Sequence, residues 1–164
     1  HGPAEDEAAD GLDTSRALTL PGRDRVRTVA KHLALIDEAP RLVITSPLVR
    51  ALQTAEIVAT TIGVQAPVEA NRMLAPRGHA HDFVRECASQ NKKRMLVVGH
   101  EPDLSLLVGQ LLDQPLPYGF MKGMVVSVRV PNEGGPCSLR FVLDPKSLQM
   151  LADHRTGKAP ASGD

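Results

Sequence analysis

Three side chains in this sequence could bind and transfer a phosphoryl group: His1, Arg50 and His100. His1 precedes a glycine, Arg50 lies four residues after Ser46, and His100 follows a glycine at the end of an apolar run. A guanidinium binds two oxygens of a tetrahedral oxyanion, and free backbone N–H groups at a helix start add partial positive charge. One neutral imidazole can attack phosphorus, and a second, protonated imidazole can stabilise the oxygens. The three side chains favour phosphoryl-transfer chemistry.

Each of these side chains also has a structural interpretation. A single histidine in a turn can be a hydrogen-bonded structural residue, and an arginine can simply be solvated. A helix N-terminus can also bind phosphate without cleaving it. The catalytic interpretation therefore requires that the fold bring the three side chains together.

The element expected to position His100 is the stretch from Met95 to Ser105. Residues 95–98 are four consecutive apolar residues, which suit a parallel strand covered on both faces. A helix should begin near Pro102, because apolar residues follow at i, i+3 and i+4 spacing. Open α/β sheets bind ligands at the carboxyl ends of their strands, so we expect His100 in such a crevice.

Strands and helices alternate through the first two thirds of the chain, which predicts a three-layer α/β/α sandwich with a mainly parallel sheet and a C-terminal antiparallel hairpin. The predicted helices cover residues 19–36, 46–61, 80–88 and 102–112, and the predicted strands cover residues 42–45, 64–68, 95–98, 124–130 and 139–143. We predict a single domain over residues 1–150 and a disordered tail over residues 151–164.

The composition limits the partners and the compartment. The 164 residues include 19 basic and 19 acidic side chains, so no overall field attracts nucleic acid or an anionic membrane. No apolar run approaches the ~20 residues of a membrane span, and the acidic first residues do not resemble a targeting peptide. Cys87 and Cys137 are predicted to be free thiols. We expect a cytoplasmic monomer without nucleic-acid or membrane partners.

Four segments together resemble a known family. They are His1-Gly2-Pro3-Ala4-Glu5, Arg16-Ala17-Leu18-Thr19, Ser46-Pro47-Leu48-Val49-Arg50-Ala51-Leu52-Gln53-Thr54-Ala55 and Gly99-His100-Glu101-Pro102. Their types and order resemble the histidine phosphatase superfamily, also called phosphoglycerate mutase-like, and within it the short SixA-like phosphohistidine phosphatases. The resemblance covers nearly the whole chain.

The resemblance implies roles for individual residues. His1 would be the phosphorylated nucleophile, and Arg50 and His100 would form the phosphate pocket. Substrate-binding positions would be Gly2, Arg16, Ser46 and Glu101. Neither a cofactor nor a metal is expected, and His79 and His81 with Asp82 are too loosely spaced for a metal site.

The implied function is removal of phosphate from a phosphohistidine protein, such as a phosphorelay domain, through a covalent phosphohistidine enzyme. Two alternatives remain open at this point. One is a phosphomonoesterase for a small phosphorylated metabolite, and the other is a module that binds a phosphorylated ligand without turnover.

Two features of the sequence differ from the family pattern. Family members begin with an apolar strand that ends in an arginine ahead of His-Gly, so we expect such a strand before His1. Larger members place an acidic glutamate after the third strand, whereas residues 72–79 contain none. Phosphohistidine releases imidazole, whose conjugate acid has a pKa of ~6.5, whereas a phosphate ester releases an alcohol of pKa ~15. The departure of imidazole therefore depends less on a proton donor than the departure of an alcohol. The missing acid favours phosphohistidine, with His79, Asp82 and Glu101 as alternative donors.

Overall fold

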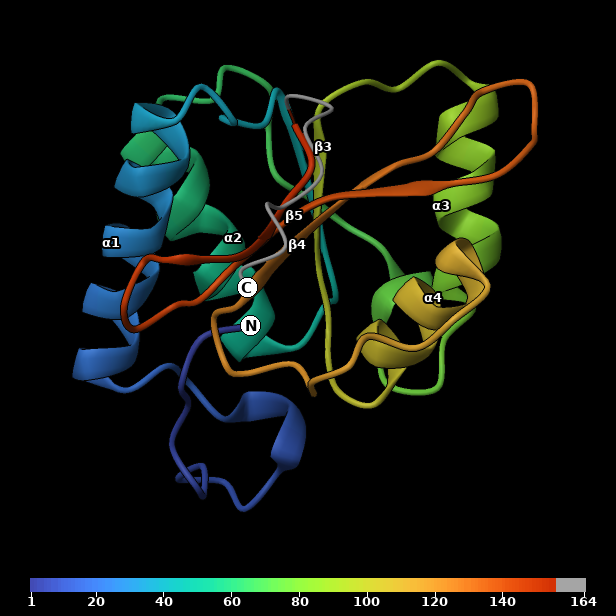
Figure 1. Cartoon of the computed structure of the whole chain (residues 1–164). Coiled ribbons are helices and arrows are strands. Elements are labelled where there is room, and N and C mark those ends of the chain that lie inside the picture. The colour runs from blue at the N-terminus through green and yellow to red at the C-terminus, as the bar shows by residue number, and fades with distance from the viewer. Residues whose placement is uncertain (156–164) are drawn as a thin grey trace.

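The computed structural model describes residues 1–155 and shows helices on both sides of the β-structure (Figure 1). Helices α1 (Leu20–Leu35) and α2 (Val49–Ile62) lie on one side, and α3 (Ala80–Ser89) and α4 (Asp103–Leu112) lie on the other. The predicted α/β class is confirmed. None of the helices in this described range has the length and apolar character of a membrane span.

A parallel three-stranded sheet carries the elements on which the site is built. It consists of β1 (Leu42–Thr45), β2 (Glu69–Ala70) and β3 (Met95–Val98) in the order β2-β1-β3. β1 and β3 pair in register from Leu42↔Met95 to Thr45↔Val98, so their carboxyl ends lie at the same edge. The residues that follow these two strands are Ser46 and Gly99-His100.

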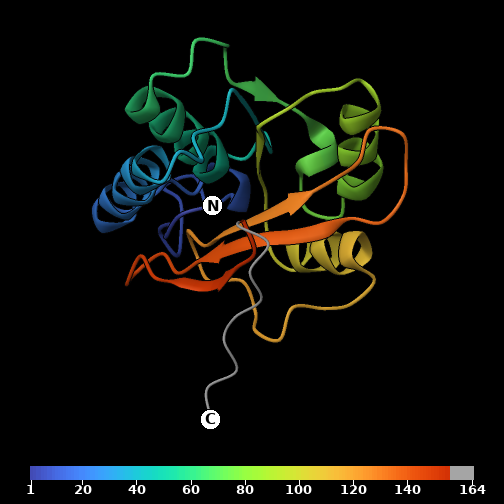
Figure 2. The ribbon, with the colours of Figure 1, turned by 45° about the horizontal axis from the view of Figure 1, so that its top comes forward.

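The C-terminal third forms a separate antiparallel sheet, drawn in orange and red in Figure 2. Its strands are β4 (Val125–Arg129), β5 (Ser138–Leu143) and β6 (Met150–Asp153), in the order β4-β5-β6. β4 and β5 form the antiparallel pair that the sequence predicts.

The alternation of side chains along β1 explains the layers. Val43 packs with the alanines of α2 (Ala51, Ala55 and Ala59) on one face, where the small side chains let the helix approach closely. Ile44 faces the other way and packs with Phe83 of α3 and Leu107 of α4. Both β1 side chains are almost fully buried.

The structure corrects the predicted strand over residues 64–68 and the predicted tail over residues 151–164. Residues 64–68 are not a strand, because only Glu69–Ala70 pair with β1, and Pro67 has no N–H with which to join a ladder. Val64 and Val68 are apolar because they pack against the cluster around Val43. β6 takes in residues 151–153, so the predicted tail begins too early, since these residues pair with β5. Residues 156–164 of that tail lie outside the described residues.

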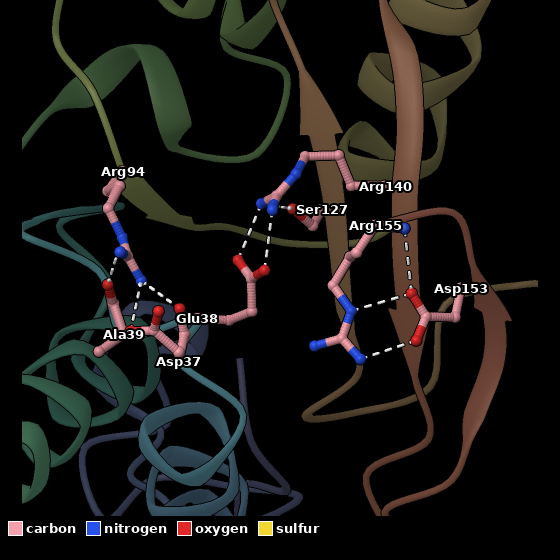
Figure 3. Close-up of polar contacts among 8 residues, drawn as sticks. All are labelled: Asp37, Glu38, Ala39, Arg94, Ser127, Arg140, Asp153 and Arg155. Carbon is pink, nitrogen blue, oxygen red and sulfur yellow. Dashed lines mark hydrogen bonds and ion pairs between the residues drawn. The ribbon is translucent and has the colours of Figure 1, made fainter. Parts of the chain in front are cut away.

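Polar contacts connect the turn after α1 to both sheets (Figure 3). Arg94, just before β3, donates from Nε to the carbonyl of Ala39 at 3.0 Å and also contacts the carbonyl of Asp37. Arg140 of β5 donates two hydrogen bonds of 2.8 Å to the carboxylate oxygens of Glu38. The turn therefore links the amino end of β3 to the antiparallel sheet.

A groove of about 430 Å³ runs between the two sheets. Its walls include β3 and β4, and His1 lines it together with Glu38, Arg94 and Arg140. Within residues 1–155, β3 and β4 are the edge strands of their sheets on the sides that border this groove. Most of the remaining lining is apolar and includes residues from all four helices.

Candidate active site

The backbone of His1 lies between the two sheets. Its nitrogen donates to the carbonyl of Gly99, which follows β3, at 3.2 Å, and its carbonyl accepts from the N–H of Gly123, which precedes β4, at 2.9 Å. The Nδ1 atom of the ring is 2.7 Å from the carbonyl of Gly2. A carbonyl only accepts hydrogen bonds, so Nδ1 carries the proton and Nε2 retains its lone pair. Nε2 is therefore the atom of His1 that can act as a nucleophile.

The start of α2 supplies three side chains on one helical face, at positions i, i+3 and i+4. Arg50, only 4% exposed, donates from Nε to Nε2 of His1 at 3.3 Å. Gln53 accepts the backbone N–H of Leu18 at 2.7 Å. Thr54 accepts the N–H of Gly2 at 3.1 Å and donates to the carbonyl of Arg50 at 2.7 Å. These contacts explain the spacing of the Ser-Pro segment, because one helical turn positions both the cation and the loop that carries His1.

His100 lies beside His1, with 5.1 Å between the ring centroids and 56° between the ring planes. Its Nε2 forms a 2.7 Å hydrogen bond with the hydroxyl of Ser46, and only 4% of the residue is exposed. Burial, with a smaller contribution from the Arg50 guanidinium, lowers the pKa of His100 to about 4. The imidazole is therefore neutral at pH 7 in the unliganded site. Its Nδ1 is buried and has no hydrogen-bond partner among residues 1–155, which leaves hydrogen-bonding capacity for a ligand.

Asp13 and Arg16, from the segment between His1 and α1, complete the site. Asp13, in the short 3₁₀ helix η1 (Asp13–Ser15), accepts from Arg50 through its carbonyl at 2.7 Å and through Oδ2 at 3.0 Å. Its Oδ1 pairs with Arg16 at 2.7 Å. The motifs point to Arg16 but not to Asp13, whose partner Arg50 is 37 positions away and leaves no local sequence signal.

Gly2 and Glu101 have local structural contacts in addition to their predicted substrate roles. A Cβ on residue 2 would lie 2.6 Å from Cγ2 of Val26, so only glycine fits this close approach. The carboxylate of Glu101 accepts from the N–H and hydroxyl of Ser105 at 3.1 and 2.6 Å, at the start of α4.

The structure thus brings His1, Arg50, His100, Ser46 and Gly2 together, with Arg16 connected through Asp13. His81 contacts the carboxylate of Asp82 at 3.4 Å near the start of α3. Within residues 1–155, no group of three or more histidine, cysteine or acidic side chains is arranged to hold a metal ion.

Comparison with known proteins gives consistent results. A model of the histidine phosphatase superfamily (branch 1) matches residues 1–77. An uncharacterised protein of Picosynechococcus sp. is 39% identical over 110 residues, 63% of this chain and 64% of that protein, so the match spans less than two thirds of its length. The phosphohistidine phosphatase SixA of Escherichia coli is 28% identical over 153 residues, 92% of this chain and 93% of SixA. A solved structure of the protein histidine phosphatase SixA with tungstate has a TM-score of 0.82 at 27% identity, covering 91% of this chain and 96% of that one.

The α/β fold, with two imidazoles and a buried arginine at one sheet edge, defines a phosphatase. The matches run across the segments that supply these side chains. This chain is similar to the histidine phosphatase superfamily over residues 1–77, and to SixA over 92% of its length.

Proposed function

We propose that this chain is a phosphohistidine phosphatase that works through a covalent phosphohistidine on His1. The observation that carries this proposal is the fixed tautomer of His1, whose Nδ1 donates to Gly2 while Nε2 faces the Arg50 guanidinium at 3.3 Å. A nucleophile whose lone pair already points toward a cation needs little reorganisation when an oxyanion binds.

The reaction consists of two displacements at phosphorus. In the first, the Nε2 lone pair of His1 forms an N–P bond while the bond from phosphorus to the substrate imidazole breaks, and the released nitrogen takes up a proton. In the second, water attacks phosphorus, the bond to His1 breaks and its electron pair returns to Nε2, which releases phosphate. His79, Asp82 and Glu101 remain alternative donors for the proton.

His100 supports both displacements from the buried side of the site. Its pKa of about 4 describes the unliganded site, where burial and Arg50 disfavour the imidazolium. A phosphoryl group beside the ring adds negative charge and raises this pKa, so the ring can gain a proton and hydrogen-bond the oxygens. Arg50 and Arg16 supply the permanent positive charges.

The substrate class follows from the leaving group and from the relatives. Residues 71–78, which follow β2, contain Arg72 and Arg77 but no carboxylate of their own, and the Asp103 carboxylate beside this loop accepts the N–H of Arg77 at 3.0 Å. The loop itself therefore supplies no acid to protonate an alcohol. Imidazole leaves more readily, which favours phosphohistidine over a sugar phosphate. The similarity to SixA over 92% of the chain supports the same choice. The unpaired Cys87 and Cys137 suit a reducing compartment, and we place the activity in the cytoplasm.

The test is phosphate release from a phosphohistidine-bearing protein, compared with sugar phosphates as substrates. His1→Asn should lower turnover at least ~10³-fold, because the nucleophile is lost. His32→Asn, on α1 outside the site, is the matched control and should keep full turnover. Equal rates on sugar phosphates would favour the small-metabolite phosphatase, and phosphoprotein binding without release would favour the binding module.

A further inference from the structure

The guanidinium of Arg50 is held on two sides by different partners. Its Nε faces His1, whereas its two terminal nitrogens both bind Asp13, NH1 at the carbonyl (2.7 Å) and NH2 at Oδ2 (3.0 Å). The side chain of Arg50 is 5% exposed, and that of Asp13 is 61% exposed. A surface residue therefore fixes the orientation of a buried cation.

The same carboxylate also holds a second cation. Oδ1 of Asp13 accepts from Nε of Arg16 at 2.8 Å and pairs with NH2 of Arg16 at 2.7 Å. Hydrogen bonds from Arg50 and Arg16 lower the pKa of Asp13, so the group is a carboxylate at neutral pH. Arg16 also donates to the carbonyl of Glu5 at 3.0 Å, which ties this pair to the loop after His1.

We propose that Asp13 is a positioning residue that orients Arg50 and Arg16 toward the phosphoryl site next to His1. This inference rests on the proposed function. Asp13 occupies the terminal edge of the Arg50 guanidinium, so the Nε edge is directed at His1, where phosphorus would be attacked. A guanidinium held in this way loses less conformational freedom when the transition state forms.

Asp13 has an opposite electrostatic effect as well. Its negative charge reduces the attraction of the two arginines for any oxyanion, so in the ground state it weakens binding. The loss of Asp13 should therefore slow catalysis, because Arg50 is no longer oriented, but strengthen the binding of a simple anion, because a nearby negative charge is removed. This difference separates a positioning role from a general role in folding.

The experiment measures kcat on a phosphohistidine protein and tungstate affinity by calorimetry in Asp13→Asn. We expect kcat to fall ~10- to 100-fold, because Arg50 loses its fixed orientation. We expect tungstate to bind ~2- to 10-fold more tightly, because one negative charge beside the arginines is gone. Asp13→Glu, which keeps the charge but changes its reach, should lower kcat without the gain in tungstate affinity.

The matched control is Asp24→Asn. Asp24 forms an exposed pair with Arg27 at the same i, i+3 spacing, 2.6 Å long, on α1. This change should leave both quantities as they are. An Asp13→Asn variant with unchanged or higher kcat would overturn the inference, and so would a parallel loss of kcat and tungstate affinity. If the unsubstituted chain releases no phosphate, the proposed function itself fails, and this inference fails with it.

Discussion

The neutral state of His100 is a property of one side chain and makes stability depend on pH. The folded-state pKa is about 4, lowered by burial and by Arg50, whereas an unfolded histidine titrates near ~6.5. Between these values the unfolded chain binds a proton that the folded chain does not bind. This contribution to stability is complete above pH ~6.5 and decreases as the pH falls toward 4.

We therefore predict that His100→Asn reduces the loss of unfolding free energy between pH 7 and pH 5. Urea unfolding at both pH values measures this, with His32→Asn as the control that should behave like the unsubstituted chain. An identical pH dependence in the His100→Asn variant would contradict the assignment of a buried, neutral imidazole.

Most residues of the site can be predicted from the sequence, because motif spacing reports on single helical turns. Arg50, Gln53 and Thr54 lie on one face of α2. Arg50 and Thr54 contact His1 and Gly2, and Gln53 contacts the backbone of Leu18. Asp13 could not be predicted. It is an exposed acidic residue in an irregular loop, and its role depends on a tertiary contact with Arg50.

At the scale of elements, the sequence predicts the strands of the parallel sheet with long apolar runs, but not the strand that depends on pairing with a neighbour. β3 is a continuous apolar run, β1 is apolar except for its last residue, Thr45, and both strands lie where predicted. The sequence does not predict β6, because apolar and polar residues do not alternate along it and its Leu151 is 44% exposed. The strand forms through its pairing with β5. The sequence predicts Ser46 as the N-cap of α2 and Pro47 as its first helical residue. The helix instead begins at Val49, and Ser46 hydrogen-bonds His100 and the N–H of Leu48.

The strand expected before His1 stays a prediction, and the groove between β3 and β4 is the place where it would lie. The backbone of His1 hydrogen-bonds residues next to both strands, so a chain that continued on its amino side would enter the groove. The groove is mostly apolar, as an extended apolar segment requires.

We predict that an apolar segment of about six residues ending in arginine, joined to His1, will pair with both edges. Six residues in extended conformation are ~20 Å long, which is enough to lie along β3 and β4. Amide hydrogen exchange should slow in β3 and β4, and the melting temperature should rise, relative to a Gly-Ser segment of equal length. Equal exchange with both segments would contradict this prediction.

At the scale of the molecule, Glu38 and Arg140 link the two halves. Glu38 follows α1, its side chain is 14% exposed, and both of its oxygens accept from Arg140 of β5 at 2.8 Å (Figure 3). Bidentate, partly buried pairs are stronger than exposed ones. This pair fixes the antiparallel sheet against the parallel one and keeps the walls of the groove in place.

We predict that Arg140→Gln lowers the free energy of unfolding by about 1–3 kcal/mol, since Glu38 is left partly buried and unpaired. Arg155→Gln is the matched control, because Arg155 forms a similar bidentate pair with Asp153, only two residues away. That local pair should contribute at most about 1 kcal/mol. Equal losses in urea unfolding would show that the link between the sheets adds no stability.

The central claim is that Nε2 of His1 carries the phosphoryl group during turnover. The most direct test mixes the chain with a phosphohistidine protein, quenches within milliseconds in alkali, where phosphohistidine survives, and maps the modified residue by mass spectrometry. The account predicts a phosphoryl group on His1 that is absent from His1→Asn and still forms in His32→Asn. Phosphate release without any phosphoryl group on His1, or the same modification in the His1→Asn variant, would contradict it.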